Sequence, residues 1–351
     1  MASIVILGAG VMGSALAVPA VEAGNDVTLA GSPLDDAIVD ALARNDIHPT
    51  LDASLPDAIE PVRESALDDA TLAAADVIVL GVSSPGIGWA VERLRRANAR
   101  PDILTLVTKG LVANEDDGAP PLTYADALPT SLCATPNGLV GIGGPCIARE
   151  LALGYPTRVT FASRHRPNAE RLRELLQTDT YRIATSDDIV GVEACAALKN
   201  FLCIGVSAML TAYRLDDGHA KNPLAALFNQ AVIELAILAR WIRDQPDEPE
   251  ATPTAFDLAG MGDLHVTVGG GRNSRLGRHL GDGATLDAVL NGAMKGVTVE
   301  GVDTGRALSS ALQAACAERT LASAELPLTF AILACLCDDR PFRMDFATLP
   351  D

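Results

Sequence analysis

Lysine is scarce in this chain, and two lysines stand where an ammonium group could do chemistry. Only four of the 27 basic residues are lysine. Lys199 lies inside the most apolar stretch of the sequence, which is predicted to be a helix over 189–213. An ammonium group there must be paired, lose its proton or face a cleft. Because desolvation lowers the pKa of a lysine, Lys199 is a candidate general acid near neutral pH.

A structural ion pair is the alternative for Lys199, with Glu193 or another acid as its partner. A spacing of six on one helix puts Glu193 on a different face, which weakens that alternative. Lys109 follows an apolar run over 103–107 that is predicted to be a strand. Ligands of open parallel sheets bind outside the carboxyl ends of the strands, so Lys109 is predicted to face a cofactor. A solvated loop lysine is the alternative there.

A glycine fingerprint stands near the start of the chain. Gly8, Gly10 and Gly13 follow a strand-like run over 4–7, and a helix-like segment over 11–23 comes next. Glycines at this spacing permit a tight turn, close approach to a pyrophosphate and close packing of helix on strand. The helix N-terminus adds unpaired N–H groups. The context predicts dinucleotide binding, and a tight turn without a ligand is the alternative.

The choice between NAD and NADP depends on the residues after the second strand, which is predicted over 26–30. An acid about 20 residues beyond the glycines normally binds the adenosine ribose of NAD, whereas a nearby arginine accommodates the 2′-phosphate of NADP. Residues 31–36 read Gly-Ser-Pro-Leu-Asp-Asp and contain no arginine. Asp35 or Asp36 could bind the ribose or simply begin the next helix. NAD is favoured as the cofactor, and NADP stays open.

A second glycine-rich stretch, over 260–273, contains Asp263 and Thr267 and ends in Arg272 and Asn273. Arginine forks onto phosphate oxygens, and backbone N–H groups of a glycine-rich turn add further donors. The stretch is therefore a candidate phosphate site, with a plain surface turn as the alternative. The histidines form no ligand cluster in the sequence, so no metal site is expected.

The elements that must position these residues change in kind near residue 185. Before it, apolar strand-like runs alternate with helix-like segments, and such runs are typical of a parallel sheet covered on both faces. After it, the chain is predicted to be nearly all helical, with a loop over 244–254. The sequence predicts a Rossmann-type α/β domain with a doubly wound sheet over 1–185 and an all-α domain over 186–351. The strands are predicted at 4–7, 26–30, 77–80, 103–107, 132–134 and 159–161, and the later helices at about 189–213, 223–243, 299–316 and 327–338.

Composition limits the partners and the compartment. A net charge of −18 disfavours nucleic acid and anionic membrane surfaces. The seven cysteines lack ligand-like pairing and are expected to be free thiols in a reducing cytoplasm. Neither a signal peptide nor a membrane-spanning run is recognised, so a cytoplasmic protein without membrane insertion is expected.

Taken in order, the motifs resemble the NAD-dependent glycerol-3-phosphate dehydrogenases over almost the whole chain. The resemblance implies a Rossmann domain followed by a helical domain of the 6-phosphogluconate dehydrogenase type. It also implies hydride transfer between a nicotinamide and a phosphorylated substrate, with glycerol 3-phosphate and dihydroxyacetone phosphate as the default pair. The matching segments are the glycine fingerprint at 8–13, Thr-Lys-Gly-Leu at 108–111, Gly-Pro to Glu-Leu at 144–151, Gly-Val-Glu to Leu-Lys-Asn at 191–200, Gly-Asp-Leu to Thr at 262–267, Arg-Asn at 272–273 and Val-Glu-Gly at 299–301.

The resemblance further implies a role for each matching residue. Lys199 would be the general acid/base at the reacting oxygen, Lys109 would polarise or orient that oxygen, and Asp263 would position the lysines. The implied cofactor contacts are Gly8, Gly10, Val11, Met12, Gly13, Ser32, Ser84, Lys109, Ala148, Arg272 and Glu300. The implied substrate contacts are Lys109, Gly144, Lys199, Asn200, Asp263, Thr267, Arg272 and Asn273.

Two departures from the family's pattern leave the substrate open. The family usually has Ser or Thr, then Phe, after Gly-Pro, where this chain has Cys146 and Ile147; its bacterial members carry Thr-Arg where this chain has Asn229 and Gln230. A related phosphorylated ketose or polyol is therefore one alternative. A 2-oxoacid reductase of the ketopantoate reductase type and a non-catalytic dinucleotide-binding protein are two others. The apolar helical second half also suggests a homodimer.

Overall fold

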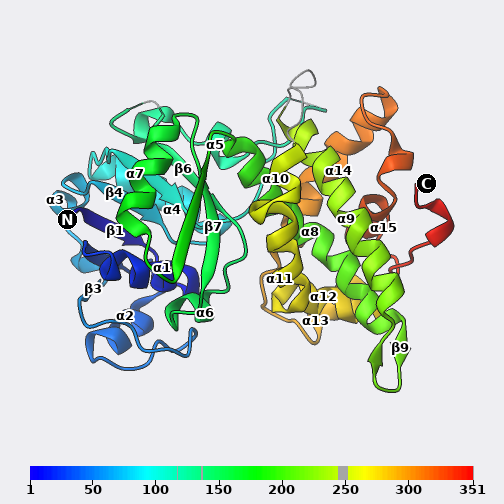
Figure 1. Ribbon diagram of the computed structural model, residues 1–351, viewed down its shortest axis with the longest axis horizontal. Coiled ribbons are helices and arrows are strands. Elements are labelled where there is room, and N and C mark those ends of the chain that lie inside the picture. Colours follow the sequence, from blue (N-terminus) through cyan, green and yellow to red (C-terminus); the bar gives the residue numbers. More distant parts are fainter. Residues whose placement is uncertain (117, 136, 244–251, 351) are drawn as a thin grey trace. The chain divides into compact units, whose positions relative to one another are not determined.

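The chain folds into two compact units, each described here by itself (Figure 1). The computed structural model describes residues 1–116, 118–135, 137–243 and 252–350. The first unit comprises 1–109 and 128–189, and the second comprises 110–127 and the described residues from 190 onward. Most of the loop predicted over 244–254 lies outside the described residues. Its last three residues, however, belong to a helix, α10 (Thr252–Phe256).

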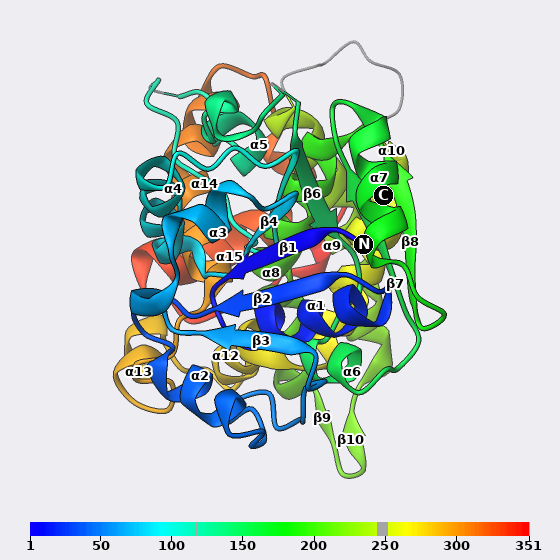
Figure 2. The same ribbon diagram turned by 90° about the vertical axis from the view of Figure 1, so that its left-hand side faces the viewer.

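An eight-stranded sheet in the order β3-β2-β1-β4-β5-β6-β7-β8 forms the centre of the first unit. All pairs are parallel except the antiparallel pair of β6 and β7. Figure 2 shows β3, β2, β1 and β4 side by side. The strands are β1 (Ser3–Leu7), β2 (Asp26–Ala30), β3 (Ile59–Val62), β4 (Val77–Leu80), β5 (Ile103–Leu106), β6 (Leu139–Gly143), β7 (Thr157–Ala162) and β8 (Tyr181–Ser186).

The strand register aligns the carboxyl ends of the central strands. Leu7 pairs with Ala30 on one side and with Leu80 on the other, and Leu80 pairs in turn with Leu106. These four residues are the last of their strands, so the segments that follow them all begin at one edge of the sheet. The predicted Rossmann-type fold is confirmed. The helices and helical turns of this unit are α1 (Val11–Glu22), α2 (Asp36–Ala43), η1 (Glu64–Ala66), α3 (Asp69–Ala73), η2 (Ser84–Gly86), α4 (Ile87–Arg96), η3 (Thr130–Leu132), α6 (Ala148–Ala152) and α7 (Arg166–Leu176).

The predicted strand over 132–134 is wrong. Residues 130–132 form the turn η3, and the strand of that region is β6. Packing explains the exchange, because Cys133 lies so close to Gly138 that a Cβ on the glycine would come within 2.6 Å of the cysteine Cβ. Leu132 and Cys133 are buried although they belong to no strand, which accounts for the apolar signal. The glycines of β6 carry no apolar signal of their own, and the strand was missed.

The second unit is helical and is built around α8 (Ile189–Ala212). Two glycines let other helices approach α8 closely. A Cβ on Gly277 would lie 2.2 Å from the Ile204 carbonyl oxygen, and one on Gly301 would lie 2.4 Å from the Asn200 carbonyl oxygen. A short hairpin, β9 (Arg214–Leu215) and β10 (Gly218–His219), corrects the all-α prediction. The other elements are α5 (Tyr124–Ala127), α9 (Lys221–Ile242), α10, the π-helical turn η4 (Leu258–Gly262), α11 (Asp263–Gly269), α12 (Gly271–Gly281), α13 (Leu286–Asn291), α14 (Glu300–Ala317), η5 (Ser323–Glu325), α15 (Pro327–Asp338) and η6 (Phe346–Thr348).

By length and composition alone, α8 and α9 pass the test for membrane spans. The most apolar window of α8 is 94% buried inside the protein, and that of α9 is 50% buried. Such burial is typical of core helices in a folded unit, so the two helices are weak evidence for a membrane.

Candidate active site

In the first unit, the predicted site residues follow the carboxyl ends of the strands. The glycine turn comes after β1, Ser32 after β2 and Ser84 after β4, while Gly144 and Ala148 come after β6. The segment after β5, which carries Lys109, is tied to the one after β4, because Thr108 Oγ1 donates to the Val82 carbonyl at 2.5 Å. The fold thus brings together, at one edge, the positions at which open α/β sheets bind ligands.

The glycine turn between β1 and α1 has the shape of a cradle for a pyrophosphate. Gly8 has a φ of +112°, and a Cβ there would lie 2.8 Å from the Gly81 carbonyl carbon. A Cβ on Gly13 would lie 2.3 Å from the Gly8 oxygen. A Cβ on Gly10 would meet only the Gly81 oxygen, at 3.8 Å, so the chain's own packing does not require glycine there. A phosphate group bound before the α1 N-terminus would have its negative charge stabilised by the helix dipole.

Three side chains hold the Ala9 peptide at the centre of this turn. Its N–H donates to Asp35 Oδ2 at 3.1 Å, and its carbonyl accepts from Ser14 Oγ at 3.0 Å. The same carbonyl lies 3.0 Å from His48 Nε2. Because His48 Nδ1 accepts from the N–H groups of Thr50 and Leu51, the ring proton is assigned to Nε2, which donates to Ala9.

Sequence reasoning missed His48, which is fully buried. It lies 39 residues beyond Ala9, and no motif or periodicity in the sequence connects the two.

In the second unit, Lys199 forms a buried ion pair with Asp263. Lys199 Nζ lies 2.6 Å from Asp263 Oδ1, and the two side chains are 7% and 3% exposed. Nζ also donates to Thr267 Oγ1 at 2.8 Å, while that hydroxyl donates to the Asp263 carbonyl at 2.6 Å. Asp263 and Thr267 lie one turn apart on α11, a spacing that puts both on one helix face. The apolar helix α8 thus carries an ammonium group that is held by a carboxylate and a hydroxyl of α11.

The sequence left Glu193 or another acid as the possible partner of Lys199, and the partner in this ion pair is Asp263, which is distant in the sequence. The nearer acid, Glu193, accepts from the Ala125 N–H at 2.8 Å. Ala125 belongs to α5, in a segment that lies in the second unit although it precedes residue 185.

Cys203, one turn beyond Lys199 on α8, was not predicted to be near the site. Its thiol donates to the Thr267 carbonyl at 3.3 Å. Burial raises the pKa of this thiol to about 11, so it stays protonated at neutral pH. The thiol therefore connects α8 to α11 beside the ion pair.

Arg272 and Asn273 lie in the first turn of α12 and contact the N-terminus of α14. Arg272 forms an ion pair with Glu300, the first residue of α14. Asn273 Oδ1 accepts from the Gly301 N–H at 2.9 Å, and Gly301 packs on Asn200 of α8. These five residues connect the start of α12 to the helix that carries Lys199. The predicted site residues of the second unit thus gather in one region.

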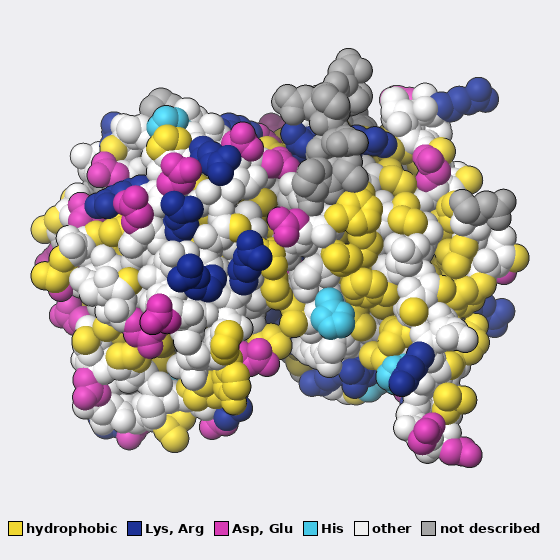
Figure 3. Space-filling view, viewed as in Figure 1, with side chains coloured by type: hydrophobic (Ala, Val, Ile, Leu, Met, Phe, Trp, Pro, Cys, Tyr) yellow, Lys and Arg dark blue, Asp and Glu magenta, His cyan; other side chains and the backbone are white. Residues whose placement is uncertain are grey.

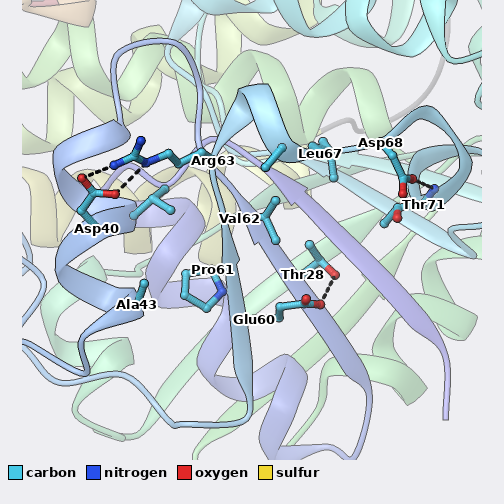
Figure 4. A pocket seen from close by; sticks show the side chains of 12 residues that line it. Thr28, Asp40, Ala43, Glu60, Pro61, Val62, Arg63, Leu67, Asp68 and Thr71 are labelled. Atoms are coloured by element: carbon cyan, nitrogen blue, oxygen red, sulfur yellow. Dashed lines mark hydrogen bonds and ion pairs between the residues drawn. The ribbon is translucent and has the colours of Figure 1, made fainter.

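A hollow of about 470 Å³ lies elsewhere, beside the edge strand β3 (Figure 4). Three acids, Asp40, Glu60 and Asp68, line it together with Arg63. Both nitrogens of the Arg63 fork donate to Asp40, at 2.7 and 2.5 Å. A surplus of carboxylates makes this hollow a poor site for a phosphorylated ligand. Across the described residues, His, Cys, Asp and Glu form no group of three or more that could hold a metal ion.

Comparison with known proteins identifies the family. Two family models cover most of the chain: the NAD-dependent glycerol-3-phosphate dehydrogenase N-terminus matches residues 3–169 and the C-terminus matches residues 188–344. The NADP(+)-dependent glycerol-3-phosphate dehydrogenase of Archaeoglobus fulgidus is 32% identical over 292 residues, covering 81% of this chain and 82% of that protein.

The chain belongs to the NAD-dependent glycerol-3-phosphate dehydrogenase family.

Other members of the glycerol-3-phosphate dehydrogenase family agree. The glycerol-3-phosphate dehydrogenase [NAD(P)+] of Symbiobacterium thermophilum is 34% identical over 309 residues, covering 86% of this chain and 82% of that protein. The crystal structure of glycerol-3-phosphate dehydrogenase from Coxiella burnetii has a TM-score of 0.73 at 25% identity, covering 97% of this chain and 96% of that one. The resemblance drawn from the motifs is confirmed, and the chain is an NAD(P)-dependent oxidoreductase. A structure from the ketopantoate reductase group, at 16% identity, shows a shared fold alone.

Proposed function

We propose that this protein interconverts glycerol 3-phosphate and dihydroxyacetone phosphate, with Lys199 as the general acid/base. The observation that carries the proposal is the buried ion pair of Lys199 and Asp263 with the hydroxyl of Thr267, in one unit with the Arg272 and Asn273 pair. An ammonium group held in an apolar helix by a carboxylate can deliver a proton to an oxygen that becomes negative during reaction.

Reduction of the ketone needs a hydride at the carbonyl carbon and a proton at its oxygen. When bound, the nicotinamide supplies the hydride. Lys199 then gives one proton from Nζ to the nascent alkoxide and is left as a neutral amine, which regains a proton from solvent. Asp263 holds the ammonium form and its orientation, since Oδ1 lies 2.6 Å from Nζ. Alcohol oxidation runs through the same steps in reverse.

The substrate phosphate would bind at the start of α12. Arg272 offers a guanidinium that is 52% exposed, and the helix N-terminus offers backbone N–H groups. Thr267 and Asn273 would add a hydroxyl and an amide. In a protein with a net charge of −18, this local basic site is what an anionic substrate requires. Arg272 would then share its charge between the phosphate and Glu300.

We further propose that Lys109 orients or polarises the reacting oxygen, as the family resemblance implies, and that 1–185 is the cofactor domain and 186–351 the substrate domain, with 110–127 as a segment of the first range that belongs to the second unit. Lys109 follows β5 at the carboxyl edge of the sheet, where a nicotinamide ring would lie. The division of the family models, at 169 and 188, supports a boundary in this region. Gly144, Ser84 and Ala148 would contact the cofactor or the substrate from the neighbouring strand ends.

The test is NADH oxidation by purified protein with dihydroxyacetone phosphate, run beside other phosphorylated ketones and 2-oxoacids, and repeated in molar salt. Lys199→Ala should lower kcat by about 10²–10⁴ while NADH still binds. Lys221→Ala is the matched control, since it removes an exposed lysine from the start of α9 and should change nothing. Full turnover in the Lys199 variant would remove that residue from the mechanism. NADH binding without turnover on any of these compounds would favour a non-catalytic protein.

We also propose a cytoplasmic homodimer formed through an apolar face of the second unit. Figure 3 shows hydrophobic side chains gathered over α9. Ile233 on α9, Phe256 on α10 and Met261 on η4 have exposed fractions of 39%, 45% and 41%. Exposed apolar patches of this kind are typical of subunit interfaces. Light scattering after chromatography should give twice the mass of the chain, and a monomer at micromolar concentration would contradict this.

A further inference from the structure

Glu300 brings a carboxylate to the place where the substrate phosphate is proposed to bind. It is the first residue of α14, and it forms an ion pair with Arg272 in the first turn of α12. The Glu300 side chain is 21% exposed, and that of Arg272 is 52% exposed. Because half of the Arg272 side chain faces solvent, an incoming anion meets a guanidinium that already has an anionic partner.

The first turn of α12 has no acid of its own. Its N-cap residue, Gly270, also offers no side chain to the N–H groups that lack a partner within the helix. These N–H groups and the helix dipole favour a negative group at this end. A Cβ on Gly269, Gly270 or Gly271 would meet nothing within 4 Å, so the approach to the turn is open. The carboxylate that contacts this turn, through Arg272, comes from another helix.

The backbone that carries Glu300 is fixed beside Arg272. The next residue, Gly301, donates its N–H to Asn273 Oδ1 at 2.9 Å. A Cβ on Gly301 would lie 2.4 Å from the Asn200 carbonyl oxygen, so α14 packs directly on α8 at this point. The start of α14 therefore cannot withdraw when a phosphate binds Arg272, and only the Glu300 side chain can yield.

We propose that Glu300 is a built-in competitor for the anion site, which occupies Arg272 in the unliganded enzyme and weakens the binding of phosphate. The inference rests on the proposed function, since it concerns the regulation of the same site. A phosphate group must displace the carboxylate from the guanidinium or share the guanidinium with it, and either arrangement opposes its binding. A free phosphate ion has nothing else to offset this cost, whereas a phosphorylated ketone also offers its carbonyl oxygen to Lys199. Glu300 thus keeps the site free of inorganic phosphate while the substrate still binds.

Calorimetric titration of inorganic phosphate into the whole protein, without NADH and without turnover, tests the proposal. Glu300→Gln keeps the size of the side chain and removes its charge, so phosphate should bind this variant at least about tenfold more tightly than the wild type. Glu300→Asp keeps the charge and should bind phosphate less tightly than Glu300→Gln does. Asp303→Asn is the matched control, because it removes the charge of an exposed acid from the same first turn of α14. It should change the affinity by less than about twofold.

Two further variants assign the effect to Arg272. Arg272→Gln should lose most of the affinity for phosphate. In the double variant Arg272→Gln, Glu300→Gln, the gain seen in Glu300→Gln alone should disappear, because the carboxylate and the phosphate no longer compete for one guanidinium.

Several results would overturn the proposal. They are equal or absent phosphate binding in Glu300→Gln and the wild type, an equal gain in Asp303→Asn, or a full gain in the double variant. If Arg272→Gln binds phosphate as tightly as the wild type, the proposed position of the substrate phosphate fails together with this inference. If the affinity depends on Arg272 but not on Glu300, the inference alone fails.

Discussion

Replacing Asp263 by asparagine tests whether the Lys199 ammonium depends on a buried carboxylate. The side chain keeps its size, but Lys199 loses the charge that lies 2.6 Å from Nζ. Both groups are more than nine-tenths buried, so solvent screens the pair poorly. The variant should therefore lose stability and activity together.

Two opposed terms set the magnitude of this loss. At an effective dielectric constant of ~20, two unit charges at this separation attract by about 6 kcal/mol. Desolvation of each ion offsets several kcal/mol of that attraction, so the intact pair contributes little net stability. Removing one partner alone leaves the desolvation cost of the other, and Asp263→Asn should lower the free energy of unfolding by about 3–5 kcal/mol. The value of kcat should fall by about 10²–10⁴, because the ammonium form is no longer held.

Urea unfolding followed by circular dichroism measures the first quantity, and NADH oxidation with dihydroxyacetone phosphate measures the second. Asp282→Asn is the matched control, since Asp282 pairs with Arg214 on the surface, with side chains 41% and 62% exposed. It should cost less than about 1 kcal/mol and leave kcat unchanged. The double variant Lys199→Met, Asp263→Asn should regain part of the lost stability and stay inactive.

Unfolding of Asp263→Asn at the same urea concentration as Asp282→Asn would refute the dependence of Lys199 on Asp263. The dependence would also be refuted if the double variant lost as much free energy of unfolding as the Lys199→Met and Asp263→Asn variants lose in sum, since the charges would then act independently.

Three further predictions concern other parts of the molecule. Burial raises the pKa of Glu234 above 4.5, so the folded state binds its proton more tightly than the unfolded state does, and stability is lost as pH rises from about 4.5. The stability of the wild type relative to Glu234→Gln should thus fall as the pH rises above about 4.5 in urea titrations. A rise would show that ionised Glu234 is favoured where it accepts from the Leu328 and Thr329 N–H groups. His48→Ala should weaken NADH binding by about 3- to 10-fold, because one hydrogen bond to the glycine turn is lost. His48→Gln should restore part of this affinity. An equal change in the KM for dihydroxyacetone phosphate would indicate general disruption of the fold instead. In the native protein a thiol reagent at pH 8 should react fastest with the exposed Cys337 and slowly with the four buried cysteines, since burial raises the pKa of Cys133 to about 11 and that of Cys335 to about 12. Seven fast thiols before denaturation would mean that the core is open.

Much of the fold could be predicted because its signals are local. The spacing of Gly8, Gly10 and Gly13 between a strand and a helix is a property of six residues, and the structure places the turn between β1 and α1. The apolar run around Lys199 similarly predicted a buried helix, which is α8. Signals weaken where a strand lies at an edge or is rich in glycine, and β3 and β6 were missed for that reason.

The sequence by itself determined which chemical groups this protein owns and on which kind of element each one lies. Only the tertiary structure decided their partners: Asp263 pairs with Lys199 across 64 residues, Asp35 and not Asp36 turns to the glycine turn, and His48 holds Ala9 from 39 residues away. Backbone propensity and hydrophobic period act over a few residues, so the sequence displays them directly. An ion pair or a hydrogen bond between distant segments depends on how helices and strands pack, and packing is a property of the folded chain alone.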